Sequence, residues 1–270
     1  MVPTKLSAGV DLYSTQRVFT DYAYASTGAA FRLSYPFEEY WRWHLGYRIS
    51  RDSIGHVADT VVSPVLLEQK GNHVTSVISA TVNRDTRDNI QSPSRGGQVG
   101  LTVDVAGLGG DFKFIKTVAS GSYFKPIWFG HILSGRLEGG YEFPWGSDGR
   151  VPLFERFYLG GPNSLRGWKF RQVSPVDSTG FAEGGTTEVL GSAEYQIPLP
   201  FGLRIAGFFD VGNVYAQGKA FDPSKLRSDV GAGVRWLSPF GPLRLDYGVK
   251  LDRHPTEDLG AFQFSVGSAF

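Results

Sequence analysis

The sequence predicts an all-β protein, an antiparallel transmembrane β-barrel of about twelve strands with a long extracellular loop folded into its lumen. Alternating apolar and polar residues recur along the whole chain, the connections between these segments alternate between short and long, and the chain ends on an aromatic strand. The 270 residues contain no run of about 18 apolar residues, the length that a membrane helix requires. We therefore expect a single transmembrane domain over residues 1–270, built from strands.

The terminal strand, residues 260–270, is the most informative of these segments. Phe262, Phe264, Val266 and Phe270 share one face at a period of two residues. Chain ends usually fray into water, so a soluble domain rarely finishes on an exposed phenylalanine. An apolar outer face that ends on an aromatic residue is typical of the closing strand of a transmembrane barrel. The strand therefore predicts a protein of the bacterial outer membrane.

The same alternation predicts the remaining strands, each near the length of about 9–11 residues that a tilted membrane strand needs. Strands are expected near 5–16, 24–37, 39–52, 73–84, 96–106, 111–125, 131–143, 186–199, 203–215, 228–238, 242–252 and 260–270. Their polar face carries opposite charges, which favours a wet lumen over a dry sandwich core. The opposite charges on this face include Arg136 with Glu138, Arg204 with Asp210, and Arg244 with Asp246.

Connection lengths indicate which face lies inside, because periodicity alone leaves a soluble sandwich open. Tight turns near 36–38, 199–202 and 238–242 alternate with longer connections near 52–72, 144–185, 216–227 and 252–259. Short turns on one rim and long loops on the other are the pattern of an outer-membrane barrel. Two connections fit less well, since 84–96 is long for a periplasmic turn and 106–110 is short for an outer loop.

Composition and motif searches argue against several classes of function. The absence of cysteine excludes disulfides and thiol catalysis, and a net charge of +1 without a basic run argues against nucleic-acid binding. The five histidines are scattered, and the sequence contains neither a Gly-x-Ser-x-Gly elbow nor a metal-spaced cluster. We therefore predict no enzymatic activity, no catalytic residue, no metal and no cofactor.

The longest connection, 144–185, contains the segment YLGGPNSLRGW at residues 158–168. Gly160, Gly161 and Pro162 indicate a sharp turn. One interpretation is an ordinary surface loop with an exposed arginine. The other is a loop folded into the lumen, where Arg166 would form a bidentate pair with inward carboxylates.

Four motifs, in this order, resemble the BamA family of outer-membrane β-barrel insertases and its relatives in organelle envelopes and two-partner secretion. Residues 160–168 are similar to the arginine-glycine-aromatic signature of the family's long loop, and residues 208–215 (FFDVGNVY) to its aspartate-x-glycine strand. Residues 231–248 are similar to the penultimate hairpin, and residues 262–270 to the closing strand and C-terminal signal. The matches cover roughly the last three quarters of the chain.

The resemblance implies a role for each matching residue. Arg166 would be the arginine that anchors the loop in the lumen, with Gly167 and Trp168 completing the signature. Asp210 and Glu194 would be its acidic partners, and both fall independently on the polar face assigned to the lumen.

The resemblance also implies that the terminal strand is a signal read during biogenesis, carried by Phe262, Phe264, Val266 and Phe270. A simple interface anchor is the alternative interpretation of Phe270. Because the first predicted strand is a different strand from the family's, we expect residues 5–12 to close the sheet with residues 260–270.

Family members have about sixteen strands and periplasmic POTRA domains, and the sequence matches neither feature, so we expect a truncated form. The resemblance implies the barrel domain of a factor that folds and inserts β-barrel proteins into the bacterial outer membrane, here with weak or no activity. A passive pore or structural barrel is the alternative, and a soluble adhesin sandwich is a third interpretation. The expected partners are outer-membrane lipid and, in the parent protein, unfolded outer-membrane clients and assembly-complex lipoproteins bound through the absent POTRA domains.

Overall fold

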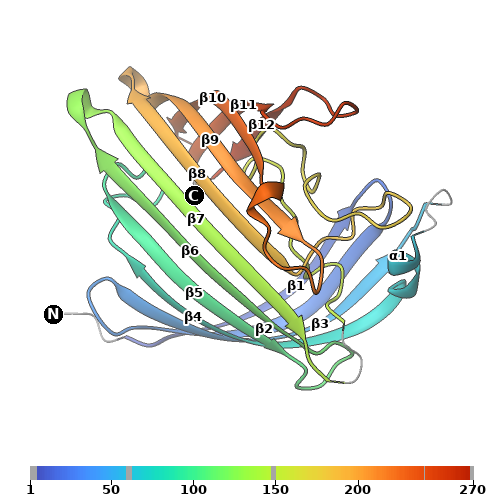
Figure 1. The fold of residues 1–270 in the computed structure, drawn as a ribbon. Helices are drawn as coiled ribbons and strands as arrows, with labels where there is room; N and C mark the ends of the chain where they lie inside the picture. The colour runs from blue at the N-terminus through green and yellow to red at the C-terminus, as the bar shows by residue number, and fades with distance from the viewer. Residues whose placement is uncertain (1–4, 59–62, 147–149, 240, 268–270) are drawn as a thin grey trace.

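The computed structural model describes residues 5–58, 63–146, 150–239 and 241–267. They form one antiparallel sheet of twelve strands in sequence order (Figure 1). The strands are β1 (Ser7–Val18), β2 (Ala23–Pro36), β3 (Trp41–Gly55), β4 (Gly71–Asp85), β5 (Gly96–Ala106), β6 (Phe114–Pro126), β7 (Ile132–Pro144), β8 (Thr187–Pro198), β9 (Leu203–Tyr215), β10 (Arg227–Ser238), β11 (Gly241–Lys250) and β12 (Gly260–Val266). The all-β class and the number of strands are thus confirmed.

In the described ranges, helical structure is limited to short segments. These are α1 (Pro64–Glu68) and the 3-10 turns η1 (Trp128–Gly130), η2 (Pro200–Gly202) and η3 (Pro223–Lys225). No helix in the described part of the chain is both long and apolar enough to span a membrane.

Strand ends agree with the predicted ones to within about three residues, the usual uncertainty at the end of an element. Two predicted strands, 96–106 and 203–215, coincide with β5 and β9. The last predicted strand is observed as Gly260–Val266, and residues 268–270, with Phe270, lie outside the described residues.

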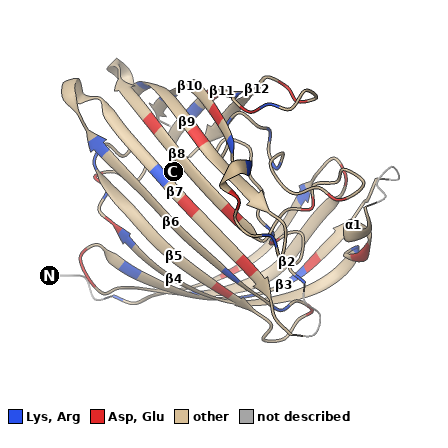
Figure 2. Cartoon of the chain, viewed as in Figure 1, with Lys and Arg blue, Asp and Glu red and all other residues tan. Residues whose placement is uncertain are grey.

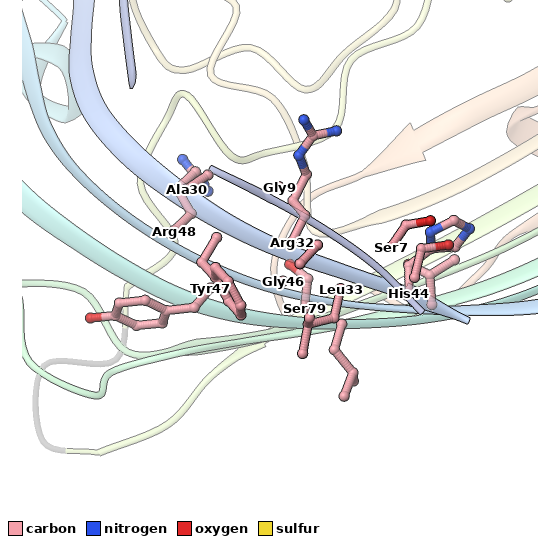
Figure 3. A pocket seen from close by; sticks show the side chains of 15 residues that line it. Ser7, Gly9, Ala30, Arg32, Leu33, His44, Gly46, Tyr47, Arg48 and Ser79 are labelled. Carbon is pink, nitrogen blue, oxygen red and sulfur yellow. The ribbon is translucent and has the colours of Figure 1, made fainter. Parts of the chain in front are cut away.

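The sheet is apolar outside and polar inside. Large apolar side chains such as Leu137 (72 % exposed) and Phe262 (76 % exposed) project from its convex face. Figure 3 shows Arg32 on the opposite side of the β2–β3 sheet from Tyr47. Acidic and basic positions are interspersed along the strands in Figure 2. This pattern fits a sheet whose outer face meets lipid and whose concave face lines a lumen.

The connection between β7 and β8, called the long loop below, folds against the concave face as predicted. One buried cluster joins Leu165 and Trp168 of the loop to Leu190 of β8 and Val214 of β9. A second cluster joins the loop to the opposite part of the sheet. Its buried members are Tyr22, Ile54, Leu66, Leu153 and Phe181. The long loop therefore crosses the lumen, whereas the domain limits 1–270 and 144–185 stay predictions.

The connection between β4 and β5 also folds inward, which explains its unexpected length. Arg204 of β9 donates to the carbonyl oxygens of Pro93 at 3.1 Å and Ser92 at 3.2 Å. Its third contact is the side chain of Gln196 at 2.9 Å. Arg204 and Asp210 both lie on the polar face, as predicted, but six residues along β9 separate them by about 20 Å, so they do not contact each other.

The other two sets of opposite charges named from the sequence lie close together. Arg136 Nη2 lies 2.7 Å from Glu138 Oε2, and Arg244 Nε lies 3.5 Å from Asp246 Oδ2. Both pairs are two residues apart on one strand, where side chains share a face.

The expected pairing of residues 5–12 with residues 260–270 is not observed among the described residues, and residues 268–270 lie outside them. Strands β1 and β12 are the two edges of the sheet, and no ladder joins them within the described residues (Figure 1). The long loop lies between the two halves of the sheet, with one buried cluster against β8 and β9 and another against β2 and β3.

The assignment of the two faces predicts that a charge introduced on the convex face lowers the stability more than one introduced on the concave face. Leu137→Arg places a cation on the convex face and should cost about 2–4 kcal/mol of unfolding free energy if lipid covers that face. Gln98→Arg is the matched control, because it places the same cation on the polar, concave face. Gln98 lies there in one cross-strand row with Ser122 and Arg136. Urea unfolding in lipid vesicles measures both variants. Equal losses would contradict the assignment of the faces.

Candidate functional site

The candidate site is built around the guanidinium of Arg166, at the tip of the long loop. Its Nε and Nη2 donate to the two carboxylate oxygens of Asp210 at 2.7 and 2.8 Å, a bidentate pair. Its Nη1 donates to Glu194 Oε2 at 2.6 Å. Arg166 is 2 % exposed and Asp210 is 0 % exposed. The structure thus brings together the three charged residues that the sequence singled out.

Two neighbours hold the guanidinium plane. The ring centroid of Phe208 lies 3.5 Å from Arg166 Cζ, so the cation rests against an aromatic face. Ser192 Oγ accepts from Arg166 Nη2 at 3.2 Å and donates to Asp210 Oδ1 at 2.6 Å. A lysine could not make these contacts, since they need a planar fork of several donors.

Further charges extend the site across β10 and β11. Arg235 donates to Glu194 Oε2 at 2.7 Å and to Asp246 Oδ1 at 2.5 Å. Asp246 Oδ2 also lies 3.7 Å from Arg166 Nη1 and 3.5 Å from Arg244 Nε. The resulting arginine–carboxylate cluster contains Arg166, Arg235, Arg244, Glu194, Asp210 and Asp246. Its three cations balance three anions.

The sequence did not single out Arg235 as a site residue. In the ladders, Arg235 faces Arg204 on β9 and Arg244 on β11, which aligns three cations across neighbouring strands. Such a row of cations requires anions nearby. This row, which marks Arg235 as a site residue, can be recognised only once the strand register is known.

The cluster keeps Arg166 charged. Burial by itself would lower the pKa of its guanidinium, but the carboxylates of Asp210, Glu194 and Asp246 outweigh burial and raise that pKa above its ordinary value. Buried charges persist where ion pairs and hydrogen bonds offset their desolvation. Within the described ranges, no group of three His, Cys, Asp or Glu residues is placed to hold a metal ion.

Gly167 and Trp168 complete the docked signature. A Cβ at position 167 would lie 2.8 Å from the Cβ of Asp229, so only glycine fits there without a shift. Trp168 is fully buried, with Arg227 Cζ 5.1 Å and Lys250 Nζ 5.5 Å from its ring centroid. The three residues therefore dock as one unit, by charge, close approach and apolar packing.

The glycines before the signature form the turn that presents it. Gly160 and Gly161 have φ of 104° and 103°, a region that favours glycine. The N–H of Gly161 donates to the carbonyl of Trp168 at 2.9 Å, and Ser164 Oγ accepts from the N–H of Gly160 at 2.9 Å. Hydrogen bonds within the loop itself therefore shape the turn at its tip.

The predicted signal residues of the terminal strand lie apart from this cluster. Phe262, Phe264 and Val266 are exposed on the convex face of β12, and Phe270 is outside the described residues. Their role as a signal stays a prediction.

Loss of Arg166 should be far more costly than loss of an exposed cation. Arg166→Ala leaves buried carboxylates without their partner and should cost about 3–5 kcal/mol of unfolding free energy. Lys169→Ala is the control, because its 2.8 Å pair with Asp258 is largely exposed and should contribute only about 0–1 kcal/mol. Equilibrium unfolding in lipid vesicles measures both. Similar losses would show that the Arg166 cluster does not hold the loop.

Comparisons with known proteins agree with this geometry. A family model described as the Omp85 superfamily domain matches residues 3–270. The outer membrane protein assembly factor BamA of Nitratidesulfovibrio vulgaris is 34 % identical, over 98 % of this chain and 34 % of its own length. The BamA of Neorickettsia risticii is 31 % identical, over 92 % of this chain and 34 % of its own length. The chain spans about a third of the length of these relatives.

Solved structures show the same fold. BamA from Haemophilus ducreyi lacking POTRA domains 1-3 superposes with a TM-score of 0.81 at 21 % identity, over 97 % of this chain and 59 % of that one. CdiB from Acinetobacter baumannii gives a TM-score of 0.57 at 17 % identity, over 97 % of this chain and 47 % of that one. With a family match over nearly its whole length, the chain belongs to the Omp85 superfamily and is a β-barrel domain of the bacterial outer membrane.

Proposed function

We propose that the chain is the barrel region of an outer-membrane protein assembly factor, which folds and inserts β-barrel proteins into the outer membrane. The observation that carries the proposal is the loop signature, docked through Arg166 on β8 and β9 inside a sheet with two edge strands. Two relatives above 30 % identity bear the name of this activity. The docked loop and the edges are the parts that such an activity would use.

The edge strands suggest how a client chain would bind. An edge strand offers unpaired N–H and C=O groups, and another chain can add a strand to it through main-chain hydrogen bonds. In the hydrocarbon region this pairing is strongly favoured, because each unsatisfied backbone N–H or C=O group there costs several kcal/mol. Templated pairing needs no covalent chemistry, so we propose a non-enzymatic role without a cofactor.

The same geometry suggests the partners. Outer-membrane lipid would cover the apolar convex face, where Leu137 and Phe262 are exposed. Unfolded outer-membrane clients would meet an edge strand. Assembly-complex lipoproteins would bind periplasmic domains of the longer protein.

Client folding into lipid vesicles tests the proposal. We expect only a weak acceleration by this chain, about twofold or about 0.4 kcal/mol of barrier. Arg166→Ala should abolish the acceleration, and Lys169→Ala should retain it. Equal rates for the unaltered chain, Arg166→Ala and empty vesicles would argue against the proposal.

A passive pore or structural barrel is the alternative function, and planar-bilayer recording separates it from the proposed one. A loop held by Arg166 inside the lumen should allow only small, flickering currents, and Arg166→Ala should enlarge them. Steady, large conductance from the unaltered chain would favour the pore.

A further inference from the structure

The side chain of Gln263 links the terminal strand of the sheet to the loop signature. Gln263 lies on the concave face of β12, is 8 % exposed and stands opposite Asp246 in the β11–β12 ladder. Its Nε2 donates to the carbonyl oxygen of Trp168 at 2.8 Å and to that of Arg166 at 3.2 Å. Within β12, Gln263 is the residue whose side chain hydrogen-bonds to the described part of the long loop.

This contact depends on donor chemistry. A primary amide has two N–H donors on one nitrogen, and here both acceptors are carbonyl oxygens on either side of Gly167. The amide oxygen could not take that position, since it would face two other oxygens. A glutamate carboxylate has nearly the same shape but only accepts, and a leucine side chain does neither.

The segment that Gln263 holds is also fixed from beneath. A Cβ on Gly248 of β11 would lie 2.5 Å from the backbone nitrogen of Gly167, so the signature rests directly on that strand. From the other side, the carbonyl of Trp168 accepts the turn hydrogen bond from Gly161 as well as the one from Gln263. The signature therefore has little freedom to follow β12 if that strand moves.

Within the described residues, strand β12 is an edge of the sheet, and its ladder joins it to β11 alone. A shift of β12 by one residue would turn Gln263 to the convex face and break both of its hydrogen bonds. Moving the edge strand and releasing the loop are therefore not independent events.

We propose that Gln263 is a positioning residue that couples docking of the loop signature to the register and pairing of β12. Its importance for client assembly rests on the function proposed above, whereas the coupling itself does not. Linked equilibria are reciprocal, so loosening the loop must loosen β12 and loosening β12 must loosen the loop.

Hydrogen–deuterium exchange of the whole chain in lipid nanodiscs tests the coupling. In Gln263→Leu, the amides of Gly161, Arg166 and Trp168 should exchange about tenfold faster, as expected for the loss of two hydrogen bonds. The β11–β12 amides should also exchange faster, and so should those of β12 in Arg166→Ala. Unchanged exchange in the loop of Gln263→Leu would overturn the proposal.

Two further variants separate donor chemistry from packing. Gln263→Glu keeps the shape and places a carboxylate against two carbonyl oxygens, so it should loosen the loop at least as much as Gln263→Leu. If Gln263→Glu exchanges like the unaltered chain, the residue only fills space and the proposal fails. Gln98→Leu is the matched control, because Gln98 has the same concave-facing side chain type on β5 and hydrogen-bonds to no described loop residue.

Client folding in vesicles then connects the coupling to activity. Gln263→Leu should no longer accelerate client folding. In a detergent gel it should still migrate differently before and after boiling, which shows that the variant itself is folded. If the unaltered chain gives no acceleration, the proposed function fails, and the exchange measurements still decide whether Gln263 couples the loop to β12.

Discussion

The structure depends on one buried arrangement of charge, in which a single arginine from a loop meets carboxylates from neighbouring strands. Glu194, Asp210 and Asp246 come from β8, β9 and β11, and none could be buried as an anion without a cation nearby. Arg166 supplies the central cation and Arg235 the next. A slip of any of these strands by one residue would point its carboxylate toward lipid, so the cluster also fixes the register of that part of the sheet.

The long loop that carries Arg166 is also the main source of apolar packing inside the sheet. A soluble domain buries its apolar strand faces against each other, whereas here the apolar faces point outward and the loop packs against the strands from within. The loop thereby connects both halves of the sheet, with β8 and β9 on one side and β2 and β3 on the other.

Much of this was predictable because it depends on local patterns. Strand positions follow from a period of two residues, and Arg166, Asp210 and Glu194 follow from motif and face together. The contacts of Arg235, Arg204 and Gln263 depend on which residues stand opposite each other on different strands. The period of two residues does not encode that register.

The inward turn between β4 and β5 has a consequence for permeability. Beside it, Ser92, Pro93, Arg204 and Arg235 line a small cavity of about 30 Å³. Arg204 holds the β4–β5 turn through hydrogen bonds in which Arg166 takes no part. Withdrawal of the long loop alone would thus widen the lumen while the β4–β5 turn still narrows one end of it, so two segments held by separate contacts limit the passage of solutes.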